Sequence, residues 1–216
     1  MPAVIFWDVD TQRDFMEPSG KLFVPGAPEI EGTLARLTAL ARRRGIPLVA
    51  PVDDHRLEDP EIALKNPDFR ETFPPHCLRG TPGQEKVAVT RPLSPLSVEN
   101  RPYPPGELED RLRAHSGEIV IHKQRFDVFT NPNAERVLAW LDPRHVVVYG
   151  VAHDSCDRFA VEGLLQRGRA VHLVRDAVRA TRPEEGERLL AEWDRLGVGL
   201  PLTADLDEGG YLDWLG

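Results

Sequence analysis

Cys156 is the residue of this sequence best suited to act as a nucleophile. The apolar run 145–151 precedes it across a turn at 152–155, and an apolar pattern with helical spacing continues to Gly168. The run is β-branched or aromatic without polar alternation, which suits a strand buried on both faces. A thiol at the start of the following helix has its thiolate favoured by the helix dipole. Because lone cysteines are more often inert packing residues, the position alone leaves both interpretations open.

Charged side chains follow other apolar runs in the same way. They are Asp10, Asp53 with His55, and Lys123. Each has an ordinary explanation, because Asp often caps a turn or a helix and Lys is usually a solvated surface charge. Ligands of parallel sheets, however, bind beyond the carboxyl ends of the strands. Together with Cys156, four strand ends carry chemically capable side chains, and this coincidence favours an active site.

A second group of candidate residues consists of Asp53, His55 and His76. One carboxylate and two imidazoles suit Zn²⁺, with Fe²⁺ and Mn²⁺ as alternatives, and they leave coordination positions open. Asp-x-His after a strand is a weak signal, since Asp53 can cap a turn and His76 can simply sit beside its two prolines. The Pro-Pro-His-Cys setting of His76 strengthens the signal. We therefore expect a divalent metal site, with zinc as the first choice.

The rest of the pattern alternates strands with helices. Strands are expected at 4–9, 46–52, 119–122, 145–151 and 170–174, with a last short strand near 200–204 and a minor one at 86–89. Helices are expected at 28–44, 107–115, 132–141, 156–168 and 183–196. The 132–141 helix would have Asn131 as its cap and Pro132 as its first residue. The stretch 90–106, with five prolines, is expected to be irregular.

This alternation predicts right-handed βαβ units in an open, doubly wound parallel sheet of about six strands, with helices on both faces. A chain of 216 residues is long enough for one sizeable α/β core and too short for two large ones. Residues 1–216 are therefore expected to form a single domain.

Composition excludes several classes of partner and location. The net charge of −8 argues against a nucleic-acid partner, and the basic run 42–44 ends a helix, where cations are expected. Two cysteines and no secretory leader pattern indicate a reducing cytoplasm. The apolar runs are too short to span a bilayer, so no membrane partner is expected. The sequence leaves homo-oligomer formation open.

Several ordered motifs together resemble one family, the isochorismatase-like cysteine hydrolases, and within it the nicotinamidase branch. The match extends from Val4 to about Asp176, and each motif is weak alone. The motifs are Asp10-x-Gln12-x-Asp14-Phe15, Asp53-x-His55, Pro74-Pro75-His76-Cys77 with Gly80-Thr-Pro-Gly83, Lys123, and Gly150-Val-Ala152-x-x-x-Cys156.

The resemblance implies a Rossmann-like sheet and a catalytic triad of Asp10, Lys123 and Cys156. It also implies a cis peptide bond between Val151 and Ala152, with the backbone N–H groups of Ala152 and Cys156 forming an oxyanion hole.

The resemblance further implies that the metal holds the ring nitrogen of a small aromatic amide. Phe15, Phe73 and Val151 would contact this substrate, whereas Cys77 is expected to pack rather than bind metal.

The expected chemistry is amide hydrolysis through a thioester, without a redox or nucleotide cofactor. Lys123 and the helix start would favour a thiolate at Cys156 near neutral pH. Asp10 would take the thiol proton, pass it to the departing ammonia, and then activate water. Asp8 could raise the pKa of Asp10 as a like charge, but pairing with a basic residue is the preferred interpretation.

Two features depart from the family pattern. Some members have a further His after the Asp-x-His pair, but residues 56–60 offer only carboxylates here, which puts a fourth protein ligand in doubt. His153 stands where smaller polar residues are common, and it could contact substrate or be a structural, hydrogen-bonded His.

Three hypotheses follow. The first is a nicotinamidase, which converts nicotinamide to nicotinate and ammonia. The second is another amide, carbamoyl or isochorismatase-type hydrolase that uses the same triad. The third is a metal-binding or partner-binding protein without catalysis. The metal residues favour the first over an isochorismatase, because the vinyl-ether-cleaving members are expected to lack them.

Overall fold

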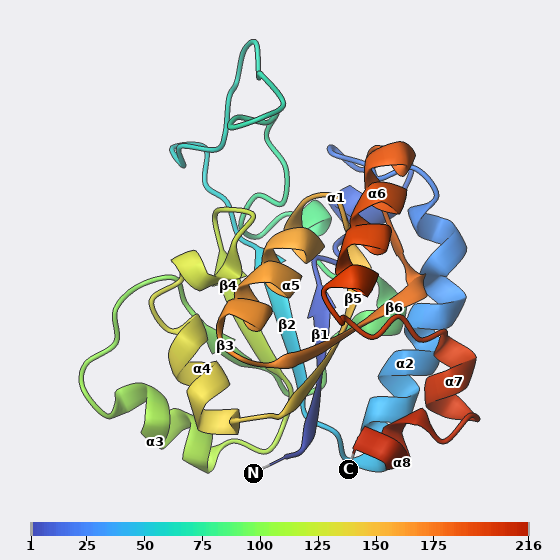
Figure 1. Cartoon of the computed structure of the whole chain (residues 1–216). Coiled ribbons are helices and arrows are strands. Elements are labelled where there is room, and N and C mark those ends of the chain that lie inside the picture. Colours follow the sequence, from blue (N-terminus) through green and yellow to red (C-terminus); the bar gives the residue numbers. More distant parts are fainter. Residues whose placement is uncertain (1, 216) are drawn as a thin grey trace.

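The computed structural model describes residues 2–215, and its centre is one sheet of six parallel strands in the order β3-β4-β2-β1-β5-β6 (Figure 1). This confirms the predicted open parallel sheet. The strands are β1 (Val4–Val9), β2 (Leu48–Asp53), β3 (Leu96–Val98), β4 (Ile119–Lys123), β5 (His145–Val151) and β6 (Ala170–Arg179). The helices are α1 (Arg13–Met16), α2 (Glu31–Arg44), α3 (Glu107–Ala114), α4 (Ala134–Leu141), α5 (Cys156–Gln166), α6 (Pro183–Arg195), α7 (Thr203–Asp207) and α8 (Tyr211–Leu215).

The central strands form because their apolar runs are buried on both faces. All six residues of β1 are buried, and so are six of the seven in β5. Alternate residues of β1 then enter different cores. Ile5, Trp7 and Val9 belong to one hydrophobic cluster, whereas Phe6 belongs to the other.

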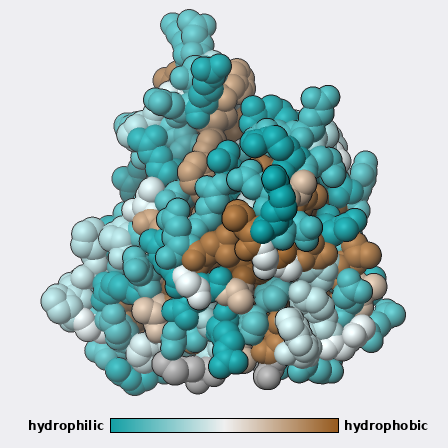
Figure 2. All heavy atoms as spheres, in the orientation of Figure 1, coloured by the Kyte–Doolittle hydropathy of each residue, from teal (hydrophilic) through white to brown (hydrophobic). Residues whose placement is uncertain are grey.

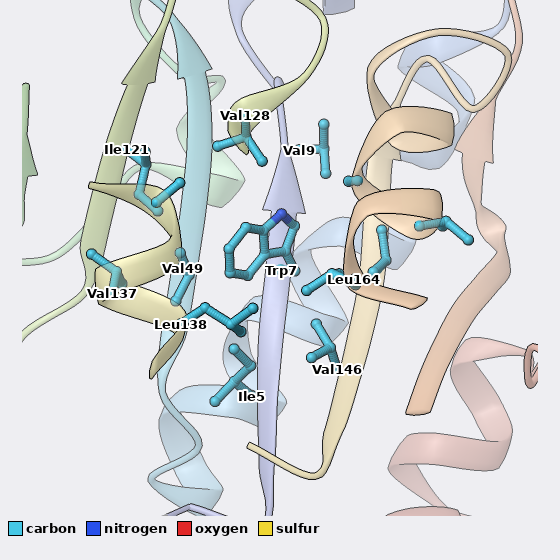
Figure 3. Close-up of a cluster of buried hydrophobic side chains, with 14 of the residues drawn as sticks. Ile5, Trp7, Val9, Val49, Ile121, Val128, Val137, Leu138, Val146 and Leu164 are labelled. Carbon is cyan, nitrogen blue, oxygen red and sulfur yellow. The ribbon is translucent and has the colours of Figure 1, made fainter. Parts of the chain in front are cut away.

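Trp7 lies near the middle of the first core, with side chains of β2, β4, β5, α4 and α5 around it (Figure 3). It is fully buried, and its ring stacks on Phe129 at a centroid distance of 6.3 Å. The residues that pack with it are mostly β-branched or Leu, for example Val49, Ile121 and Leu164. Removal of this much apolar surface from water stabilises the sheet and the helix that begins at Cys156.

The opposite face of the sheet packs on α2, α7 and α8. Leu34 and Leu37 of α2 contribute to this second core, as do Leu206 of α7 and Leu212 of α8. The sheet is therefore covered by helices on both faces, as predicted, and only its edges and strand ends are left for binding.

A long excursion rises above the carboxyl ends of the strands (Figure 1). It follows β2 and extends to the short 3-10 helix at Pro82–Gln84, and the structure places no helix or named strand in residues 54–81. Figure 2 shows a hydrophilic tip on this excursion and hydrophobic side chains below it. Long loops of this kind are usually functional.

Some predicted elements were wrong. Residues 200–204 do not form a strand, because Thr203 begins α7 and only Gly199 bridges to His172 of β6. Residues 86–89 are not a strand either, although Lys86 forms a single bridge to Gln12. The irregular stretch 90–106 contains β3, whose three residues lie within the run of prolines.

The start of α4 was also predicted two residues too early. The helix begins at Ala134, not at Pro132, and Asn133 is its N-cap residue. Asn131 still supports this turn, because its side-chain oxygen accepts a hydrogen bond of 2.8 Å from the Asn133 backbone N–H. None of the helices described in residues 2–215 is long and apolar enough to cross a membrane.

Candidate active site

Lys123 lies at the centre of a buried cluster of charged and nucleophilic side chains. Its Nζ atom is 2.7 Å from Oδ2 of Asp10, 2.5 Å from Oδ1 of Asp53 and 3.5 Å from Sγ of Cys156. All four side chains are at most 6% exposed. The structure thus brings together the three residues predicted as a triad and adds Asp53 to them.

The sheet topology explains why these side chains meet. Asp10 follows β1, Asp53 ends β2, Lys123 ends β4, and Cys156 begins α5 after β5. These four strands are neighbours, and Asp53 is the register partner of Lys123. Parallel strands that end at one edge of the sheet therefore deliver all four residues to one place. Asp10 adopts a left-handed backbone conformation with φ of 47°, which is uncommon for residues other than glycine and frequent at functional sites.

Burial controls the protonation of this cluster. It raises the pKa of Asp10 to about 6, although Lys123 acts in the opposite direction. It also raises the pKa of the Cys156 thiol well above its usual value, and Lys123 offsets only part of this. Burial therefore opposes the thiolate that the sequence predicts, whereas Lys123 favours it. The proton must leave during attack, and Asp10 lies near the thiol, because Oδ2 of Asp10 and Sγ of Cys156 both contact Nζ of Lys123, at 2.7 and 3.5 Å.

The turn before Cys156 presents backbone donors to the same space. The peptide bond between Val151 and Ala152 is cis, as the resemblance implies. Among the backbone hydrogen bonds of residues 2–215, no carbonyl accepts from the N–H of Ala152 or of Cys156. The Ala152 carbonyl instead accepts the N–H groups of Ser155 and Asp157, at 2.9 and 3.1 Å. Both free N–H groups remain available to a developing oxyanion.

Asp53, His55 and His76 form a compact group that could hold a metal ion. One candidate ligand atom of each residue lies within 4.8 Å of the others, and all three residues are buried. Nε2 of His55 is 3.6 Å and Nε2 of His76 is 3.5 Å from Oδ2 of Asp53. Oδ1 of Asp53 meanwhile faces Lys123. The Asp53 carboxylate therefore connects the metal group with the triad.

The donor atoms of this group fit a divalent cation. Nδ1 of His76 is 2.8 Å from the Pro74 carbonyl. Donation of the Nδ1 proton to that carbonyl leaves the Nε2 lone pair directed at Asp53. Among the described residues, neither buried ring nitrogen of His55 has a hydrogen-bond partner. Unpaired buried polar atoms are costly, and a bound cation would satisfy Nε2, the nitrogen that faces Asp53.

Gln12 positions Asp53, a role that the sequence motif did not reveal. Its side-chain amide donates to the Asp53 carbonyl at 2.8 Å and accepts from the Asp53 N–H at 2.7 Å. The side chain thus pairs with the end of β2 as a neighbouring strand would. Asp14 acts in a similar way on the segment that carries His76, because its Oδ2 accepts a hydrogen bond of 2.7 Å from the Cys77 N–H.

Glu61 was missed by the sequence interpretation, which looked for a further ligand only in residues 56–60. Its side chain is 3% exposed, and its Oε1 atom has no hydrogen-bond partner among the described residues. Burial raises its pKa, and the nearby charge of Asp53 raises it further. The sequence signal is weak, because Glu61 is the third acidic residue of the run 58–61, and only the folded excursion distinguishes it from the exposed Glu58.

A pocket of about 650 Å³ opens onto Cys156 from the carboxyl edge of the sheet. Asp53 and His76 also line it, so the metal group and the thiol face one cavity. The lining contains the residues that the sequence assigned to substrate and oxyanion, namely Phe15, Phe73, Val151 and Ala152. Apolar walls with a few convergent polar groups are typical of small-molecule sites.

The structure gives the contacts of Asp8, His153 and Cys77, whose roles the sequence left open. Asp8 pairs with Lys86, whose Nζ lies 3.1 Å from Oδ2 of Asp8, so the preferred interpretation holds. His153 does not line the pocket and packs so closely on Gly186 that a Cβ atom there would lie 2.3 Å from its Nε2. Cys77 is fully buried and packs in the second core, as expected.

The family model described as Isochorismatase domain matches residues 2–203. The chain belongs to the isochorismatase family. This confirms the resemblance seen in the sequence, and the match includes every strand and all helices from α1 to α6.

Curated members of the isochorismatase family include amidases similar to this chain. The nicotinamidase/pyrazinamidase of Mycobacterium tuberculosis is 26% identical, covering 89% of this chain and 95% of the relative. The N-carbamoylsarcosine amidase of an Arthrobacter species is 23% identical, covering 77% and 55%. A probable inactive nicotinamidase of Arabidopsis thaliana is 23% identical, covering 93% and 92%. These relatives support an amidohydrolase role for this family member.

Solved structures agree on the fold. The pyrazinamidase of Pyrococcus horikoshii in complex with zinc has a TM-score of 0.70 and 27% identity, covering 93% of this chain and 99% of that one. An isochorismatase family protein from Desulfovibrio vulgaris has a TM-score of 0.77 and 24% identity, covering 97% and 98%.

Proposed function

We propose that this protein is a nicotinamidase that hydrolyses nicotinamide to nicotinate and ammonia. One observation carries the proposal: the Asp10–Lys123–Cys156 cluster and the Asp53–His55–His76 group meet through Asp53 at a single pocket with aromatic walls. A nucleophile for the amide carbon and a metal group for a ring nitrogen are then available to the same small substrate.

The first half-reaction forms a thioester on Cys156. Asp10 accepts the thiol proton as Sγ attacks the amide carbon. Lys123 stabilises the Asp10 carboxylate before this transfer and the negative charge that develops on Sγ during it. The carbonyl oxygen becomes an oxyanion that the N–H groups of Ala152 and Cys156 can stabilise. Asp10 then returns the proton to the amide nitrogen, because ammonia leaves as a neutral molecule. The C–N bond breaks and the acyl group remains on sulfur.

The second half-reaction uses the same residues with water. Asp10 accepts a proton from water as the water attacks the thioester carbon. The oxyanion forms again at the same backbone N–H groups and collapses with release of nicotinate. The C–S bond breaks, and the proton held by Asp10 returns to Cys156.

Asp53, His55 and His76 would hold the metal, with Zn²⁺ as the first choice and Fe²⁺ or Mn²⁺ as alternatives. When bound, the metal supplies a Lewis acid that coordinates a ring nitrogen and orients the substrate. Phe15 and Phe73 line the same pocket and can flank the ring.

The test is the ratio of kcat/KM for nicotinamide and benzamide, measured as ammonia release by metal-loaded protein. Benzamide has the same amide and a ring of the same size but no ring nitrogen. We expect kcat/KM to be at least about a hundredfold higher for nicotinamide than for benzamide. This ratio corresponds to about 3 kcal/mol of transition-state stabilisation, through binding and orientation by the metal. His55→Ala or chelation should remove most of this preference. Equal turnover of the two amides would contradict the role of the metal as a substrate anchor.

A carbamoyl amide is the second candidate substrate, because an N-carbamoylsarcosine amidase is among the relatives. The same thiol, carboxylate and oxyanion donors could act on a urea-type carbonyl. Ammonia release from N-carbamoyl amino acids in the same assay separates this candidate from the first.

A further inference from the structure

The pocket is larger than the substrate proposed above requires. Nicotinamide is a single six-membered ring with a carboxamide, whereas the cavity is about 650 Å³, in the range of drug-sized ligands. Six of the eight phenylalanines of the protein line it: Phe15, Phe23, Phe69, Phe73, Phe126 and Phe159. A bare pyridine amide held between the metal group and Cys156 would leave the outer part of this aromatic cavity empty.

Three arginines line this pocket, and Glu162 and Glu185 are acidic residues near two of them. Arg70, Arg158 and Arg182 line the pocket and come from the excursion after β2, from α5, and from the turn before α6. Arg70 is exposed and has no ion-pair partner among the described residues. Arg182 is 72% exposed and reaches only Asp154, at 3.5 Å. Arg158 is bound to Glu162 at 2.7 Å, but its side chain remains 40% exposed.

The two carboxylates of the pocket lining do not offset these arginines. Asp53 is buried against Lys123 at the inner end. Asp154 is buried and already accepts hydrogen bonds from the Thr181 N–H and hydroxyl and from the Arg182 N–H, at 2.6 to 3.0 Å. Three arginines around one opening stand out on a protein with a net charge of −8. Guanidinium groups bind carboxylate and phosphate oxygens in a forked geometry.

We propose that the preferred substrate is a nicotinamide-type aromatic amide that also carries an anionic oxygen group, a carboxylate or a phosphate. Arg70, Arg158 and Arg182 bind this group at the outer end of the pocket, so nicotinamide itself is turned over less efficiently. The amide would meet Cys156 at the inner end, and the phenylalanines would contact the apolar part between the two. This inference rests on the proposed amidase function, and it narrows the substrate class.

The experiment compares anionic and neutral ligands of the same shape. The probes are nicotinamides that carry a carboxylate or a phosphonate at each free ring carbon, beside the methyl esters of the carboxylates. Binding to metal-loaded Cys156→Ala protein is measured by calorimetry, and turnover of the parent enzyme is measured as ammonia release.

At least one anionic probe should bind about tenfold more tightly than its ester. The better of the carboxylate and the phosphonate identifies the natural group. The preference should decrease with added salt, because the arginines are partly exposed.

The decisive variant combines Arg70→Gln, Arg158→Gln and Arg182→Gln, and it should reduce the ratio of anion to ester binding to about one. Arg113→Gln is the matched control, because Arg113 is an exposed arginine of α3 that does not line this pocket and should keep the ratio. Equal binding of acids and esters, or an unchanged ratio in the triple variant, would overturn the inference. If no amide is hydrolysed but the anion preference persists, the proposed amidase function fails while the arginine site stands.

Discussion

Asp10 is the residue whose protonation should set the pH dependence of the reaction. It must be a carboxylate to accept the thiol proton, and burial raises its pKa to about 6. As the pH falls through this value the carboxylate becomes neutral and can no longer act as a base.

We therefore expect kcat/KM to fall about tenfold per pH unit below about 6, and to be independent of this group above it. A pH profile of ammonia release under saturating metal measures this midpoint. Circular dichroism spectra, recorded first over the same pH range, check that the protein stays folded. A profile that stays flat down to about pH 4, near the usual value for Asp, would argue against Asp10 as the base.

Glu61 should strengthen metal binding, because its buried carboxylate adds negative charge beside Asp53, His55 and His76. Glu61→Gln keeps the size of the side chain and removes the charge. We expect about a tenfold or greater loss of metal affinity, as is common for groups that surround metal ligands.

The affinity of the Glu61→Gln protein can be measured by competition with a chromophoric chelator. Glu58→Gln is the control, since Glu58 is an exposed acidic residue of the same excursion. Equal affinities of the two variants would show that Glu61 has no influence on the metal.

At the scale of elements, the close contact of β1 and β5 places Asp10 and Cys156 side by side. Gly150 is the register partner of Val9, and its φ is 130°. A Cβ atom at this position would lie 2.0 Å from the Val9 carbonyl oxygen. The strands can approach only because this residue has no side chain.

Gly150→Ala should therefore destabilise the protein by about 3 kcal/mol or more, since the backbone of β1 or β5 must move. Gly168→Ala is the matched control, because Gly168 also has a positive φ, of 70°, but has open space around its Cβ position. It should cost only about 1 kcal/mol. Urea unfolding measures both, and similar costs for the two variants would contradict a steric requirement at Gly150.

For the whole molecule, local patterns in the sequence predicted the sheet and the group of residues at its carboxyl edge. The long apolar runs predicted β1, β2, β4, β5 and the first half of β6, because buried parallel strands have no polar alternation. The short strand β3 was not predicted, because it lies in a proline-rich stretch and forms by pairing with β4 and not by its own propensity. The strand predicted at residues 200–204 was wrong, because a short apolar run does not distinguish a strand from a helix.

Features that depend on the folded excursion could not be predicted. The bridging position of Asp53, the amide pairing of Gln12 and the burial of Glu61 all require residues far apart in the sequence to meet. The raised pKa of the Cys156 thiol also follows from the depth of burial, which residue types alone do not specify.

The central claim is that Cys156 is the nucleophile of an amidase, and one substitution tests it most directly. Ammonia release from nicotinamide should be measured for the parent protein and for Cys156→Ala, both loaded with zinc. Because Cys156 is buried and alanine fits the same space, folding and metal content should be unchanged. We predict a loss of kcat of about a thousandfold or more, to the background of the assay. Activity of Cys156→Ala within about tenfold of the parent would contradict the thioester mechanism.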